Sequence, residues 1–253
     1  MARSPVTLRY HPDGWAELIF CEPEFTPALC DAMLPHVEAL SQTGAGRDAV
    51  CAVVIRAWRD ESAAWPLPPD APAPGYVARA SVLVEAVAAL PMPVLALLAG
   101  EIRAEALELA LACDLRLATD DTRFSMPHLA QGRLPACGGS QRLPRVVGLS
   151  GAFELFFTGD WDAGRAHELG LINGIAAPGE LVAEGEQWCR ALAGKAPVAA
   201  RFLKEVVRRG LDVPLEQGLL IEEDAYLLLQ TTEDRKEGIR AFLEKRQPRF
   251  KGK

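Results

Sequence analysis

Two glutamates stand three residues apart in an otherwise apolar stretch. Residues 99–117 read AGEIRAEALELALACDLRL, in which Glu105 and Glu108 interrupt a run of alanine and leucine. Side chains three apart lie on one helical face, so both carboxylates can point into the same space. Burying a carboxylate without a partner costs several kcal/mol or forces its protonation. The pair of glutamates therefore indicates a site that exchanges protons. The alternative for Glu108 is a structural ion pair with Arg103 or Arg133.

A histidine follows in the segment MPHLAQGRLP. An imidazole has an unperturbed pKa of about 6.5, so His128 can transfer protons near neutral pH. The alternative is a loop histidine whose nitrogens are satisfied by hydrogen bonds.

The six cysteines form no CxxC pair, so neither a zinc site nor a disulfide framework is indicated. We expect no metal, and Cys137 is interpreted as an incidental small residue without a basic partner.

The elements that must position these groups begin with strands. Residues 6–10 and 15–20 are β-rich runs separated by the turn sequence HPDG, which predicts a hairpin. Residues 26–40 carry apolar side chains at helical spacing, with Thr26 as a capping residue, and a strand follows at 51–55. This order is typical of a βαβ unit with parallel strands and a right-handed crossover.

The rest of the chain alternates and then becomes helical. Five prolines between residues 66 and 74 exclude regular structure, so we expect a loop across 56–76. The following strands are predicted at 93–98, 114–118 and 124–127, and the helices at 77–90, 151–157, 181–192, 197–209, 214–229 and 233–245. The segment 132–148 mixes glycine, proline and basic residues before the helix at 151–157, and Gly138 and Gly139 are interpreted as a tight turn that precedes a helix. The predicted fold class is α/β, with a βα-repeating front and a helical back.

Composition excludes several classes of protein. The chain has 253 residues, 49% of them apolar, and a net charge of −7, which opposes a general nucleic-acid surface. No apolar run reaches the roughly 20 residues of a membrane helix, and residues 1–14 lack a hydrophobic signal core. We expect a cytoplasmic protein without nucleic-acid or membrane partners.

Four motifs together resemble the crotonase, or enoyl-CoA hydratase/isomerase, superfamily. They are ELALACDLRLA at 108–118, GGSQRLPRVVG at 138–148, TGDWDAGRAHELGLIN at 158–173 and GIRAFLEKRQPRFKG at 238–252. The resemblance covers almost the full length. It implies a spiral of repeated ββα units carrying an acyl-CoA site over residues 1–192. It further implies a C-terminal helical region over 193–253 that drives assembly into a homotrimer or a dimer of trimers.

The resemblance also implies how a site would work. In this family two backbone N–H groups stabilise a thioester enolate, and the matching positions are Ala64 and Glu105. The family usually has glycine in both segments, whereas this chain reads Ala104, Glu105, Ala106 in one and has Trp65 in the other. The side chain of Glu105 is then a solvated residue on one helical face with Glu101 and Glu108, a replacement acid or base, or a mark of lost catalysis.

Further residues are assigned from the same resemblance. Glu108 matches the first of two catalytic glutamates, and His128 stands where the second is expected. Phe250 and Lys251 match positions that reach the adenine and phosphates of CoA, for which an aromatic ring and an ammonium group are suited; a solvated tail is the alternative. No cofactor besides the CoA thioester substrate is implied.

The implied activity is enoyl-CoA hydration or isomerisation through an enolate. One alternative is a catalytically impaired crotonase-fold protein that binds acyl-CoA or serves as an assembly subunit. Another is an enolate-forming decarboxylase or hydrolase, because His128 breaks the hydratase pair of glutamates.

Overall fold

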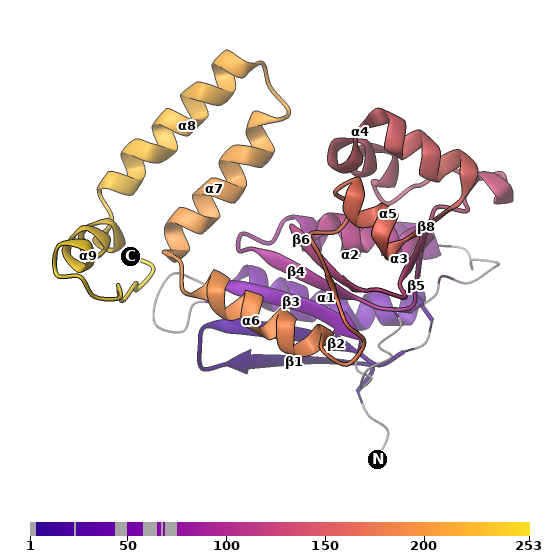
Figure 1. Cartoon of the computed structure of the whole chain (residues 1–253), viewed down its shortest axis with the longest axis horizontal. Helices are drawn as coiled ribbons and strands as arrows, with labels where there is room; N and C mark the ends of the chain where they lie inside the picture. Colours follow the sequence, from indigo (N-terminus) through magenta and orange to yellow (C-terminus); the bar gives the residue numbers. More distant parts are fainter. Residues whose placement is uncertain (1–3, 23, 44–49, 58–64, 67, 69–74) are drawn as a thin grey trace.

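The computed structural model describes residues 4–22, 24–43, 50–57, 65–66, 68 and 75–253 (Figure 1). Strand β3 (Ala52–Ala57) ends before the predicted proline-rich loop, and helix α2 (Tyr76–Ala88) begins after it. Most of that loop lies outside the described residues. Ala64, the first predicted oxyanion donor, lies outside them as well, and its role stays a prediction.

The N-terminal elements follow the predicted order. Strands β1 (Val6–His11) and β2 (Trp15–Phe20) pair antiparallel, joined by a turn in which Gly14 has a φ of 83°, a conformation that favours glycine. Helix α1 (Pro27–Ser41) begins after Thr26, whose hydroxyl accepts a hydrogen bond from the first turn. Strand β2 then pairs parallel with β3. The predicted hairpin and βαβ unit are confirmed.

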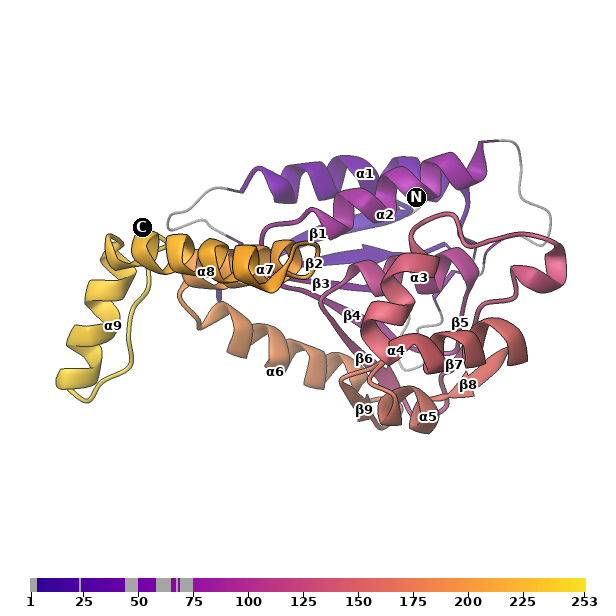
Figure 2. The same ribbon diagram turned by 90° about the horizontal axis from the view of Figure 1, so that it is seen from above.

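A six-stranded sheet forms the centre of the molecule, in the order β1-β2-β3-β4-β6-β9. Its remaining strands are β4 (Val94–Leu98), β6 (Leu115–Thr119) and β9 (Gly174–Ala176). Helices α1 and α2 cover one face, and α6 (Leu181–Ala193) lies along the other (Figure 2). Because both faces are covered, β4 is buried at all five positions, as expected of a parallel strand inside an α/β sheet.

A second, three-stranded sheet has the order β5-β7-β8. Its strands are β5 (Glu101–Arg103), β7 (Arg123–Ser125) and β8 (Asp160–Asp162). Helix α3 (Ala104–Ala112) follows β5 without a connecting residue, so this small sheet determines where α3 begins. Helix α5 (Ala163–Glu168) follows β8 in the same way. The sequence pattern missed β5, β8, β9 and α5, each too short to show a periodicity.

Helix α4 (Gly139–Thr158) differs from its prediction. The sequence indicated a tight turn at Gly138 and Gly139 and a helix over 151–157, whereas α4 is helical from Gly139 onward and bends at Gly148, whose φ is 76°. The glycines and Pro144 suggested a break in the helix. Packing of α4 against α3 outweighs this local preference.

The predicted C-terminal helices are confirmed as α7 (Pro197–Gly210), α8 (Leu215–Gln230) and α9 (Glu233–Leu243). Helices α7 and α8 pack on each other and project away from the sheets (Figure 1). The observed arrangement is α/β, as predicted. The division between 192 and 193 stays a prediction. Among the described residues, none of the helices has the length and apolar character needed to cross a membrane; the cytoplasmic location is still a prediction.

Candidate active site

Helix α3 brings the two glutamates into the interior. All nine of its residues are buried, including Glu105 and Glu108. Ala104, its first residue, has a φ of 47°, in the region that disfavours side chains with a Cβ. Glu101 is exposed on β5, so the suggestion that it shares a solvated helical face with the other two glutamates is wrong.

Glu108 is held by the start of helix α4. Its Oε1 accepts hydrogen bonds from the backbone N–H groups of Cys137, at 2.8 Å, and Gly139, at 2.7 Å. A Cβ at Gly139 would lie 2.9 Å from both Cγ and Oε1 of Glu108, so this approach requires glycine. Burial raises the pKa of Glu108 to about 7, although the two N–H groups oppose the shift. This carboxyl group can therefore give and take a proton near neutral pH.

Glu105 is paired with an arginine. Its Oε1 accepts a hydrogen bond of 2.6 Å from Nη2 of Arg133, and Glu105 is only 1% exposed. The description of Glu105 as a solvated residue is therefore wrong. The ion pair with Arg133 that the sequence suggested for Glu108 belongs to Glu105 instead.

His128 faces both carboxylates from the other side. It precedes the short 3-10 helix η1 (Leu129–Gln131), and its Nε2 lies 3.7 Å from Oε2 of Glu108 and 3.9 Å from Oε1 of Glu105. The imidazole is 1% exposed. Burial lowers its pKa and Glu105 partly opposes this shift, which favours the neutral form. The structure thus brings the predicted Glu105, Glu108 and His128 into one buried cluster.

Two further residues border this cluster, Tyr76, which the sequence did not single out, and Cys137, which it did not assign to the site. Tyr76 is buried at the start of α2, and burial together with the nearby Glu105 charge raises its phenolic pKa. Cys137 contributes its backbone N–H to Glu108, while burial raises the pKa of its thiol. The thiol therefore stays neutral, in line with its interpretation as a non-nucleophile. Because every residue except proline has a backbone N–H, no residue type in the sequence could have indicated that Cys137 donates this hydrogen bond.

The predicted oxyanion segments lie at the ends of buried elements. The N–H of Glu105 belongs to the first turn of α3, where backbone donors have no partner within the helix. Trp65 is buried, and its indole Nε1–H donates a hydrogen bond of 2.6 Å to the carbonyl of Leu97. The glycine position that Trp65 replaces is therefore filled by a ring anchored to the end of β4.

The predicted CoA-binding residues lie elsewhere within the chain. Phe250 and Lys251 belong to the C-terminal tail beside α9, remote from α3 (Figure 1). The tail is fixed by Asp234, whose carboxylate accepts hydrogen bonds from the N–H groups of Lys251, at 2.6 Å, and Gly252, at 2.8 Å. It is therefore ordered by hydrogen bonds rather than fully solvated, and its role toward CoA stays a prediction.

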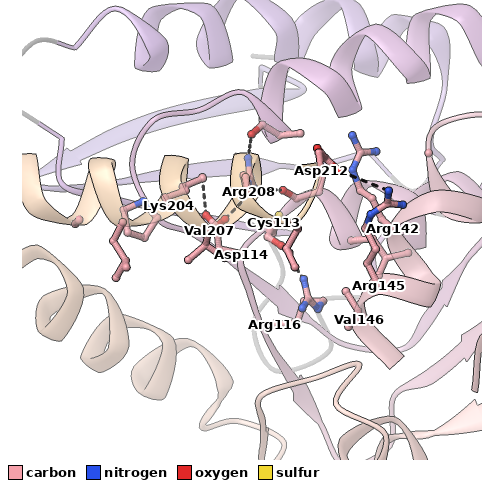
Figure 3. A pocket seen from close by; sticks show the side chains of 18 of the residues that line it. Cys113, Asp114, Arg116, Arg142, Arg145, Val146, Lys204, Val207, Arg208 and Asp212 are labelled. Atoms are coloured by element: carbon pink, nitrogen blue, oxygen red, sulfur yellow. Dashed lines mark hydrogen bonds and ion pairs between the residues drawn. The ribbon is translucent and has the colours of Figure 1, made fainter. Parts of the chain in front are cut away.

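A cavity of about 1160 Å³ lies near the C-terminal end of α3, between α4 and α7 (Figure 3). Several of its charged side chains form ion pairs. Asp114 accepts hydrogen bonds from Lys204, at 2.6 Å, and Arg208, at 2.8 Å, and Arg142 pairs with Glu85. The cluster of Glu105, Glu108 and His128 does not contribute to the lining described for it. The two ion pairs of Asp114 attach α7 to the body of the molecule.

A buried carboxylate and imidazole cluster beside a helix N-terminus, within an α/β body, has the kinds of groups that proton transfer needs. Comparison with known proteins identifies the family. A family model described as enoyl-CoA hydratase/isomerase matches residues 72–253. The chain belongs to this family, the crotonase superfamily that the motifs indicated.

Individual relatives agree with this assignment. Human enoyl-CoA hydratase domain-containing protein 2, mitochondrial, is 42% identical over 183 residues, covering 70% of this chain and 63% of the relative. Crotonyl-CoA hydratase of Syntrophomonas wolfei is 37% identical over 163 residues, covering 64% of this chain and 63% of the relative. The chain thus matches just under two thirds of the length of these relatives.

The fold is also found among solved structures. The crystal structure of enoyl-CoA hydratase from Bacillus anthracis superimposes with a TM-score of 0.92 and 27% sequence identity, covering 98% of this chain and 100% of that one. The crotonase-like α/β fold is thereby confirmed.

Proposed function

We propose that this protein is an acyl-CoA thioester enzyme of the enoyl-CoA hydratase/isomerase type. One observation carries the proposal: the Glu108 carboxyl group is fixed by two backbone N–H groups, with its other oxygen 3.7 Å from the His128 imidazole. A carboxyl group that exchanges its proton near neutral pH therefore faces a neutral imidazole in a buried site. Family membership supports a CoA thioester as the substrate.

The proposed reaction uses the resting protonation states that the site favours. The thioester carbonyl oxygen accepts a hydrogen bond from the Glu105 N–H, which stabilises negative charge as the enolate forms. Neutral His128 removes a proton from water while the water oxygen bonds to the β-carbon. Glu108 then gives its proton to the α-carbon as the enolate collapses. The proton that His128 took from water passes to the Glu108 carboxylate, 3.7 Å away, which restores both groups. Overall, H and OH add across the double bond, and no cofactor besides the CoA thioester is needed.

The test is turnover of short- and medium-chain enoyl-CoAs, followed as loss of enoyl absorbance. Replacing Glu108 by Gln keeps the shape but removes the transferable proton, and we expect a rate decrease of about 100-fold or more. Glu101→Gln is the matched control, because Glu101 is exposed on β5 and its replacement should leave the rate unchanged. A rate that Glu108→Gln does not reduce would contradict the proposal.

A second function is favoured by the Glu105–Arg133 pair, which brings a side chain into the space where the family resemblance expects glycine. A catalytically impaired acyl-CoA binder would bind acyl-CoA in calorimetry without exchanging the acyl α-proton with deuterated solvent. Such exchange shows that the enolate still forms. If the protein exchanges the α-proton but does not hydrate enoyl-CoA, the product identifies the alternative suggested by His128. Release of carbon dioxide indicates a decarboxylase, and release of free CoA indicates a hydrolase.

We further propose that the protein assembles as a homotrimer or a dimer of trimers through helices α7 to α9. Large apolar side chains on these helices are exposed in the single chain, including Leu220 at 61% and Phe242 at 82%. Exposed apolar surface of this kind is typical of an interface. Because Phe250 and Lys251 lie remote from their own Glu108, they would contact CoA bound to a neighbouring chain.

A further inference from the structure

Four polar atoms of the buried cluster have no hydrogen-bond partner among the described residues. They are Oε2 of Glu105, Oε2 of Glu108, and Nδ1 and Nε2 of His128. The three side chains are at most 2% exposed. Buried polar groups are normally hydrogen-bonded, and leaving them unpaired is costly. The cluster is therefore suited to hold something between its three side chains.

We propose that Glu105, Glu108 and His128 together bind one divalent d-block cation. The candidate ligand atoms of these three residues all lie within 4.8 Å of one another. The His128 Nε2 is 3.7 Å from a Glu108 oxygen and 3.9 Å from a Glu105 oxygen. Metal bonds of about 2.0–2.2 Å hold neighbouring ligand atoms roughly 3–4 Å apart, so the observed separations suit a shared ion.

The donor set also has the right chemistry. Two carboxylates and one imidazole suit borderline ions such as Mn²⁺, Fe²⁺ or Zn²⁺. One oxygen of each carboxylate is already bound: Glu108 Oε1 by two N–H groups, and Glu105 Oε1, the oxygen nearer His128, by Arg133. The Oε2 atom of each has no hydrogen-bond partner among the described residues. Outer partners of this kind orient ligands toward a metal. A cation would also offset the negative charge of the two buried carboxylates.

Two of the three ligands stand where the chain departs from its family pattern. Glu105 occupies a position at which the resemblance expects glycine, and His128 one at which it expects glutamate. Together they supply an additional carboxylate and an imidazole, so the cation site accounts for both departures at once.

Occupancy of the site has a consequence for turnover. A cation bonded to Oε2 of Glu108 and Nε2 of His128 uses the lone pairs that proton transfer requires. The bound ion should therefore inhibit the reaction reversibly. This consequence rests on the proposed function, whereas cation binding itself does not.

Binding is tested with Mn²⁺, because carboxylate and imidazole ligands accept it while the six free thiols prefer softer ions. Chelator-treated protein is titrated, and free Mn²⁺ is followed by its electron paramagnetic resonance signal. We expect one Mn²⁺ per chain and at least tenfold weaker binding in Glu105→Gln and in His128→Ala. Exposed Glu101 and His167 provide the matched controls: Glu101→Gln and His167→Ala should bind Mn²⁺ as the parent does.

Circular dichroism checks that each variant keeps its fold. If His128→Ala does not fold, the result is decided by Glu105→Gln, because this substitution preserves side-chain volume. Absence of stoichiometric binding in the parent, or binding unaffected by Glu105→Gln, overturns the cation site. In the turnover assay we expect Mn²⁺ to inhibit and a chelator to restore the rate. If the enzyme is active and binds Mn²⁺ without being inhibited, the inhibitory role is overturned. If the protein binds Mn²⁺ but turns over no enoyl-CoA, the lack of turnover refutes the proposed function, and the cation site is still supported.

Discussion

At the scale of single residues, Ala104 carries backbone strain at the start of α3. Its φ of 47° is disfavoured for an L-residue by about 1–2 kcal/mol. Glycine would relieve this strain but remove one buried methyl group, worth about 0.8 kcal/mol. We expect Ala104→Gly to be as stable as the parent or slightly more stable in urea unfolding.

Ala110 provides the comparison for Ala104, because it is fully buried in the same helix and has no positive φ. There, Ala110→Gly loses about 1 kcal/mol of helix propensity in addition to the methyl group. The free energies of unfolding of the two variants should therefore differ by about 2–3 kcal/mol. Equal destabilisation by both substitutions would show that Ala104 stores no strain.

The meeting of Glu108 with His128 could be predicted, because each occupies a position in a motif and the motifs share one fold. The partner of Glu105 could not be predicted. Arg133 lies 28 residues further along the chain, and nothing in local spacing distinguishes it from Arg103. Burial of Glu105 likewise depends on the chain segments around α3, which only the folded structure brings together.

At the scale of elements, the approach of α4 to α3 depends on Gly139. A Cβ there would lie 2.9 Å from the Glu108 side chain and 3.1 Å from Cβ of Pro135. We expect Gly139→Ala to displace the Glu108 carboxyl group and lower turnover at least tenfold, because proton transfer depends on placement. The rate of enoyl-CoA loss measures this effect.

Gly164 in α5 is the matched control for Gly139, because a Cβ there meets only Oδ1 of Asp162, at an ordinary 3.4 Å. Gly164→Ala should retain full turnover and gain slightly in stability from its helix propensity. If Gly139→Ala also kept full turnover, the close contact would not be needed to place Glu108.

Elements with clear periodicity were predicted within a few residues, whereas those determined by packing were not. Helices α1, α2 and α6 to α9 show their apolar spacing in the sequence. The start of α4 does not, because glycine and proline in its first half oppose a helix, and contacts with other parts of the chain, among them α3 and Glu108, stabilise one there. Three-residue strands such as β5 exist because a neighbouring strand supplies their hydrogen bonds.

At the scale of the whole molecule, the helices α7 to α9 have more apolar surface than a single chain can cover. Their exposed large apolar residues are Leu203, Val207, Leu215, Leu219, Leu220, Tyr226, Leu227, Leu228, Ile239, Phe242 and Leu243. Sequence periodicity predicts that such helices form, but it does not say whether their apolar side chains face the same chain or another one. The projection of α7 and α8 from the sheets (Figure 1) favours another chain.

This surface leads to a prediction about assembly. A charge placed in an apolar interface loses its hydration without gaining a partner. We therefore expect Leu220→Asp and Phe242→Asp each to lower the molecular mass in solution from that of three or six chains toward that of one chain. Sedimentation equilibrium measures the mass, and circular dichroism checks that each chain stays folded. Tyr10, which is 58% exposed on β1, provides the control, since Tyr10→Asp should leave the assembly intact. A parent protein that sediments as a single chain would show that these helices do not join copies of the chain.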